Sequence, residues 1–307
     1  MRERSMDYKF YTADVFTNKP FNGERITVFP NAAGLSDHQM KLIANESNAP
    51  DTVFVFDDAD KNTKQLRIFT ALKKEVKPST HTLITASFAL TTIKALPLDS
   101  STPLYFKNND NVSEIYVAND KGKPGVICQS QDTHAVIDRF VPTTEELANM
   151  LSLIPADIGF DNHQPLIVSC NAPYLIVPIK SYNAVRAARF DTKAWSQSSA
   201  PSSAALGILL FSNNTDNNVA DFHTRLVGPD IAIHEDPPVA PVIADFANYL
   251  CQNSRIQKGT HVFSVQRGAN DQRQSYLHLE MDNKRQQNLT IRVGGSAVMM
   301  AESTLSL

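Results

Sequence analysis

Glycine is scarce in this sequence, with 11 among 307 residues, and neither GxGxxG nor GxxxxGK[ST] occurs. Both motifs bring backbone N–H groups close to the phosphates of a dinucleotide or nucleotide, so the common sites for NAD and ATP are missing. The three cysteines, Cys128, Cys170 and Cys251, are far apart and form no CxxC pair. Neither a disulfide framework nor a zinc site is indicated. We therefore expect no cofactor and no metal.

Long apolar runs and blocks of like charge are missing too. No stretch of about 18 apolar residues occurs, and the opening MRERSM is charged and lacks the apolar core of a secretion signal. The net charge is −3, with no basic block suited to nucleic acid. We expect a cytoplasmic protein without a membrane or nucleic-acid partner. A chain of this length favours two domains of about 150 residues each.

The first half of the chain combines strands with two helices of different character. Between the second and third strands, Ser36 and Gln39 form a capping box ahead of a one-sided apolar stripe, which predicts a surface helix ending near Asn48. The segment from Leu83 to Ile93 carries no charge, which predicts a helix buried on most of its surface. Strands rich in β-branched and aromatic residues are predicted at 9–16, 25–29, 52–56 and 65–70.

The second half echoes the first. Strands are predicted in VIDRFVP, PLIVSC and PYLIVPI, and Thr143 and Glu146 form a second capping box. The segment FHTRLVGP corresponds to LRIFT of the first half. The segment HEDPPVAPVIADFANYL corresponds to the first buried helix. We predict an α/β (α+β) fold of two similar lobes, each a curved, mostly antiparallel sheet or barrel around a buried central helix. The lobes are predicted at 7–128, to which a last strand at about 297–307 can add, and at 133–292, with 1–6 as a tail.

The starts of the two buried helices are the predicted site. A helix N-terminus has unsatisfied N–H groups and a partial positive charge, which suits a carboxylate. If the two starts face each other, they bring His81 of one lobe opposite Glu235 and Asp236 of the other.

Six segments stand out along nearly the whole chain: ADVFTNKPFNG, LSDHQMKLIANESNAPDTVFVF, LRIFT, EVKPSTH, FHTRLVGPDIAIHEDP and IRVGGSAV. Together, and in this order, they resemble the PhzF-like family of phenazine biosynthesis, which has the diaminopimelate epimerase-like fold. The resemblance implies an isomerase or epimerase that needs no cofactor or metal and moves a proton on a small carboxylate-bearing substrate. A carboxylate would act as acid and base, and a homodimer is common in the family.

The resemblance also assigns residues. The family motif N-L-S-E-T reads NAPDT here, which puts the expected catalytic carboxylate at Asp51, and G-H-P-T reads THTL, which keeps His81. In EDPPVAPV, Asp236 is kept as the third catalytic residue. Substrate-binding positions fall on the two residues that flank His81, on the positions of the family's glycine and serine, and on two matching arginines: Thr80, Thr82, Ala240, Pro241, Arg225 and Arg273.

Departures from the family pattern leave alternatives open. Pro241 offers neither N–H nor hydroxyl to an anion, although proline suits a first helical turn, and Thr80 replaces a glycine that permits positive φ and close ligand approach. Asp51 can instead cap a turn after Pro50, and Asp236 can cap the second helix. A chain that keeps the fold but serves as a small-molecule or protein binding module is the rival hypothesis. A cysteine-pair racemase is disfavoured, because neither helix start contains cysteine.

Overall fold

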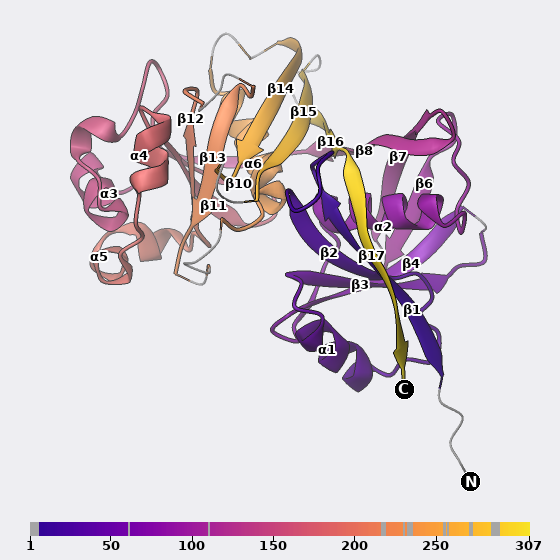
Figure 1. The fold of residues 1–307 in the computed structure, drawn as a ribbon. Coiled ribbons are helices and arrows are strands. Elements are labelled where there is room, and N and C mark those ends of the chain that lie inside the picture. The colour runs from indigo at the N-terminus through magenta and orange to yellow at the C-terminus, as the bar shows by residue number, and fades with distance from the viewer. Residues whose placement is uncertain are drawn as a thin grey trace. The chain divides into compact units, whose positions relative to one another are not determined.

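The computed structural model of the chain (Figure 1) describes residues 6–60, 62–109, 111–215, 219–229, 231, 236–253, 256, 258–269, 273–283 and 289–307. The chain divides into two compact units. Unit 1 comprises residues 1–130 and 293–307, and unit 2 comprises residues 131–292. In the described part of the chain, no helix is both long enough and apolar enough to cross a membrane.

Unit 1 is built on a mixed sheet. Its strands are β1 (Asp7–Val15), β2 (Glu24–Phe29), β3 (Asp51–Asp57), β4 (Thr63–Thr70), β5 (Glu75–Val76), β6 (Leu104–Asn108), β7 (Asn111–Asp120), β8 (Lys123–Thr133, whose last residues fall in unit 2) and β17 (Ala297–Ser306). β1 pairs antiparallel with β2 and β17, and β3 with β4. β2 runs parallel to β3, and β4 runs parallel to β6. The pairs β4–β5, β6–β7 and β7–β8 are antiparallel.

The two helices of unit 1 lie against side chains that alternate along these strands. Phe29 and Phe54 pack with Met40 and Ile43 of α1 (Asp37–Glu46). The predicted Ser36–Gln39 capping box is present at the start of this helix. α2 (Thr80–Thr92) contacts β1, β2, β3, β7 and β17, and its residues 80–91 are all buried. The prediction of a largely buried second helix is therefore confirmed.

Unit 2 repeats the pairing pattern of unit 1. Its strands are β9 (Val136–Asp138), β10 (Leu166–Ser169), β11 (Pro173–Pro178), β12 (Ile208–Ser212), β13 (Phe222–Val227), β14 (Gly259–Arg267), β15 (Ser275–Asn283) and β16 (Leu289–Gly295, which ends in unit 1). β9–β10, β10–β11, β12–β13 and β14–β15 are antiparallel, whereas β11–β12 and β13–β14 are parallel. The predicted correspondence between FHTRLVGP (β13) and LRIFT (β4) is confirmed. β13 is antiparallel to β12 and parallel to β14, just as β4 is antiparallel to β3 and parallel to β6.

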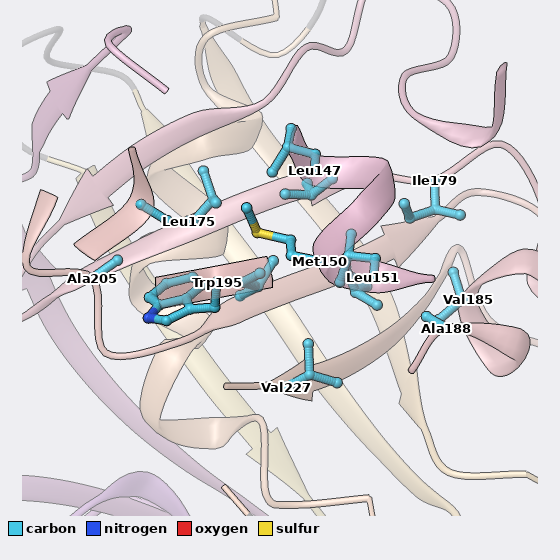
Figure 2. Close-up of a cluster of buried hydrophobic side chains, with 14 of the residues drawn as sticks. Leu147, Met150, Leu151, Leu175, Ile179, Val185, Ala188, Trp195, Ala205 and Val227 are labelled. Atoms are coloured by element: carbon cyan, nitrogen blue, oxygen red, sulfur yellow. The ribbon is translucent and has the colours of Figure 1, made fainter. Parts of the chain in front are cut away.

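Unit 2 has helices on both faces of its sheet. They are α3 (Thr144–Leu151), α4 (Tyr182–Ala187), α5 (Thr192–Gln197) and α6 (Ile243–Leu250), with short 3₁₀ turns η1 (Pro155–Asp157), η2 (Ala200–Ser203) and η3 (Ala240–Val242). Figure 2 shows one core of unit 2, where Trp195 of α5 packs with Leu147 and Met150 of α3 and with Val227 of β13. The predicted Thr143–Glu146 capping box is present at α3. On the other side, Phe246 of α6 packs with aromatic rings of β12 and β13.

The order of helices in unit 2 corrects one sequence interpretation. α3 precedes the β10–β11 pair, so the place of α1 between two parallel strands is taken by α4 and α5, which the sequence analysis did not predict. Each has six residues, which is too short to show a helical repeat.

Candidate functional site

Unit 1 brings two of the predicted catalytic residues together. Asp51 Oδ2 lies 2.7 Å from His81 Nε2. The side chain of Asp51 is 14% exposed and that of His81 is 3% exposed, so Asp51 is the member that reaches solvent. Asp51 is the first residue of β3, and its carboxylate contacts an imidazole. A carboxylate and an imidazole at this distance can share and transfer a proton.

A second carboxylate lies near the other nitrogen of the same ring. Glu24 Oε2 is 3.8 Å from His81 Nδ1, and the Glu24 side chain is fully buried. The hydroxyl of Ser79 is closer to Nδ1, at 3.1 Å. Sequence reasoning missed Glu24, although a glutamate at the start of a strand that ends in apolar residues was a usable signal.

The residues that flank His81 have their hydroxyls engaged within unit 1. The Thr80 hydroxyl donates to Gln129 Oε1 at 2.7 Å, and both residues are buried. Thr82 accepts the Ser79 N–H at 2.9 Å and donates to the Ser79 carbonyl at 2.8 Å. Thr80 is the first residue of α2, and its φ is not positive. The positive φ that glycine permits is therefore not required at this position.

Unit 2 places the third predicted residue, Asp236, between two arginines. Its Oδ1 lies 3.0 Å from Arg225 Nε, and its Oδ2 accepts from Arg186 Nη1. The Asp236 side chain is 4% exposed. Arg225 Nη1 also contacts the carbonyls of Val185, Arg186 and Ala188 at the end of α4, as cations do at helix C-termini. Asp236 therefore connects its own segment to α4 and β13.

The reading of Asp236 as a helix cap is wrong, because the residues preceding η3 and α6 are Val239 and Val242. Ala240 and Pro241 form the 3₁₀ turn η3 that precedes α6, with Ala240 buried and Pro241 exposed. Proline thus serves in a first turn, as the sequence predicted. The carbonyl of Arg273 accepts from Arg267 Nη1 at 3.0 Å. Glu235 lies outside the described residues, and the facing of the two helix starts stays a prediction.

His223 is a buried titratable residue that the sequence analysis treated as ordinary. It lies on β13 with no exposed surface, and its ring centroid is 4.5 Å from that of Tyr182. Burial, with Arg186 adding to it, lowers the pKa of His223 to about 4. The ring is therefore neutral at pH 7.

Replacing His223 by phenylalanine is expected to flatten the dependence of the unfolding free energy on pH. In the unfolded chain the pKa returns to about 6.5, so between about pH 4 and 6.5 the unfolded chain binds more protons than the folded chain. The stability that comes from the neutral ring is complete above about pH 6.5 and is lost as the pH falls toward 4. The loss is about 3 kcal/mol, at 1.36 kcal/mol for each pKa unit.

The measurement is urea unfolding at several pH values, followed by fluorescence of Trp195, which is the chain's single tryptophan and is buried in unit 2. Asp245 acts in the opposite direction, since burial raises its pKa to about 6. Its stabilisation is complete below about pH 3.9 and is lost as the pH rises toward 6. Asp245 is present in both chains, so its effect cancels in the comparison. Equal slopes for the two chains would contradict the prediction.

Two further kinds of site have little support in the described part of the chain. Burial raises the pKa of Cys170 to about 12 and that of Cys251 to about 11, so both thiols stay protonated and are poor bases. No three described His, Cys, Asp or Glu side chains are arranged to hold one metal ion. Around His81, the carboxylate of Glu24 lies near Nδ1 and that of Asp51 near Nε2, on different sides of the ring.

A cavity of about 710 Å³ lies at the other end of α2 from His81. Its walls include Phe88, Thr91, Leu96 and Met299, with Lys94 among the lining residues. None of the predicted site residues lines it. Its size alone gives no reason to move the candidate site there, because it holds no carboxylate or imidazole to transfer a proton.

Comparison with solved structures defines the class of fold. A phenazine biosynthesis protein of the PhzF family from Bacillus anthracis has a TM-score of 0.85 at 19% identity, covering 98% of this chain and 99% of its own. A hydroxyproline epimerase from Agrobacterium vitis has a TM-score of 0.58 at 8% identity, with 99% and 93% covered. The fold is thus the mixed α/β, strand-rich fold of diaminopimelate epimerase-like racemases and epimerases, as the resemblance implied.

The family follows from the sequence match. The model of the PhzC-PhzF family, described as phenazine biosynthesis-like protein, matches residues 13–303, and the chain belongs to this family. An uncharacterized isomerase of Mesorhizobium japonicum is 26% identical, over 98% of this chain and 99% of that protein. The trans-2,3-dihydro-3-hydroxyanthranilate isomerase of Pseudomonas chlororaphis is 23% identical, over 98% and 100%. The distant homologues of the chain are therefore isomerases.

Proposed function

We propose that the chain is an isomerase that moves a proton from one carbon to another on a small carboxylate-bearing metabolite. The observation that supports this most directly is the 2.7 Å contact between Asp51 and His81, at the positions where the family motifs put an acid/base carboxylate and a histidine. In the proposed reaction Asp51 takes a proton from carbon and returns it to another carbon, so the product is an isomer of the substrate. His81 donates a hydrogen bond from Nε2 to Asp51 and steadies its carboxylate, and Asp51 itself holds the proton between the two steps.

The remaining predicted residues have different parts in this proposal. The N–H groups at the start of α2 are suited to the carboxylate of the substrate. Asp236 holds Arg186 and Arg225 in place, and we assign it to the structure of unit 2. No metal or cofactor enters the proposed reaction. Cytoplasmic location and a homodimer stay predictions from the sequence.

The binding-module hypothesis has one specific observation in its favour. Thr80 stands where the family usually has glycine and is tied to Gln129, and Pro241 has no N–H to offer. Pro241 removes a backbone donor for an anion, and a lost hydrogen bond to a charged group costs about 1.5–3 kcal/mol. Thr80 keeps its N–H but has a side chain where the family's glycine permits close ligand approach.

Two NMR experiments on the same panel of small amino, hydroxy and unsaturated acids separate these functions. Saturation-transfer spectra identify which acids bind, and incubation in D₂O shows whether deuterium enters at a carbon of the bound acid. We expect binding together with exchange for at least one acid. Acids that bind tightly and never exchange would contradict the isomerase proposal and favour the binding module.

A further inference from the structure

We propose that Glu24 is a positioning residue of this site, whose buried carboxylate favours the protonated form of His81 beside Asp51. Its use in proton transfer rests on the proposed function. Glu24 is 2% exposed and its Oε2 lies 3.8 Å from His81 Nδ1, while Asp51 Oδ2 lies 2.7 Å from Nε2. The imidazole therefore has one carboxylate near each of its nitrogens.

The strand register explains why both carboxylates meet the ring. In the parallel pair of β2 and β3, Ile26 lies opposite Asp51. Glu24 is two residues before Ile26 and so points to the same face of the sheet. Both strands begin at this end, and α2 starts there with His81 as its second residue. The arrangement thus depends on regular backbone and not on a loop.

The electrostatics favour the charged ring. A carboxylate removed from water is costly unless an opposite charge or hydrogen bonds compensate it. A positive charge on His81 lies close enough to Glu24 and to Asp51 to stabilise both. A negative charge near each ring nitrogen favours the imidazolium form of His81. The imidazolium carries an N–H on Nε2, which can donate to Asp51 and keep it as the carboxylate that accepts a proton from carbon.

Other charged groups on the strands that contact α2 have partners elsewhere. Asp14 of β1 pairs with Arg25 and so lies on the other face of the sheet from Glu24, and it accepts the Phe21 N–H at 3.0 Å. Four more charged residues of these strands contact side chains other than His81: Asp7 contacts Ser306, Lys9 contacts Glu302, Asp57 contacts Lys64, and Glu114 contacts Tyr116. The side chain of Arg25 is part-exposed, and Asp120 is exposed. Glu24 and Asp51 each have a carboxylate oxygen within 4 Å of a ring nitrogen of His81.

The test is the titration of His81 in the full chain. Long-range ¹H–¹⁵N spectra of protein labelled with ¹⁵N-histidine follow the eight histidines between pH 4 and 9, and the His81 signals are those lost in His81→Gln. Glu24→Gln keeps the shape of the side chain and removes its charge. We expect the His81 titration midpoint to fall by about one to three pH units. Asp14→Asn, which removes another buried carboxylate from the neighbouring strand, should leave it within a few tenths of a unit.

A Glu24→Gln midpoint that moves no further than that of Asp14→Asn would overturn the inference. If Glu24→Gln does not fold, the wild-type titration decides, because a midpoint at or below the ordinary value of about 6.5 contradicts a ring held protonated. The deuterium experiment keeps the two proposals apart. A shifted titration without any exchange supports the Glu24–His81 pair and counts against the isomerase, whereas exchange with an unshifted titration overturns the role of Glu24 alone.

Discussion

Asp51→Asn is expected to lower the rate of deuterium exchange by about 10²–10⁴-fold, which is the usual contribution of a positioned acid/base group. Asparagine has the size of aspartate and can still contact His81 Nε2, 2.7 Å from the native carboxylate oxygen, but it cannot take a proton. The loss should appear in the exchange rate of bound acid rather than in its affinity, because the change removes proton transfer and leaves the N–H groups at the start of α2 in place.

The control for this variant is Asp57→Asn, at the other end of the same strand. Asp57 has an 86% exposed side chain and contacts Lys64, so the same chemical change there should leave the exchange rate within about twofold, given that surface pairs contribute little. Circular dichroism and thermal unfolding verify that both variants are folded. If folded Asp51→Asn exchanges at the wild-type rate, Asp51 is not the acid/base group of the reaction.

Local patterns predicted the parts of unit 1 that depend on neighbouring residues. The capping box at Ser36 and the uncharged segment that becomes α2 are both local signals, and both are present. The Asp51–His81 contact joins residues 30 positions apart, and sequence motifs of the family brought these two to attention. Glu24 was missed because its role depends on the parallel register of β2 and β3, which no local pattern specifies.

The surroundings of Asp236 were beyond a local reading for the same reason. Arg186 is 50 residues away in sequence and lies on α4, which is too short to be recognised from its apolar spacing. Arg225 was assigned from the family pattern to a substrate carboxylate. In the structure, Arg225 forms an ion pair with Asp236. The tertiary fold buries the carboxylate of Asp236 together with the guanidinium groups of Arg186 and Arg225. A local sequence pattern cannot reveal which charges are buried together.

Asp236→Asn is expected to destabilise unit 2 by about 3–5 kcal/mol, because it removes the buried carboxylate that both Arg186 and Arg225 contact. The side chains of Arg186 and Arg225 are 18% and 14% exposed, so water cannot fully replace the carboxylate. Urea unfolding followed by Trp195 fluorescence measures the change in the same unit. The matched control is Glu280→Gln, which removes the partner of Arg292. That pair is 28% and 42% exposed and should contribute about 1 kcal/mol or less.

The outcome also decides between two roles for Asp236. A large loss of stability, with exchange preserved in the fraction that remains folded, is what a residue that anchors two arginines should show. If Asp236→Asn is as stable as Glu280→Gln and yet loses exchange, the carboxylate acts on the substrate, as the family motif first suggested. Stability and exchange respond differently because a buried ion pair acts on the folding equilibrium, whereas an acid/base group acts on the barrier between bound substrate and product.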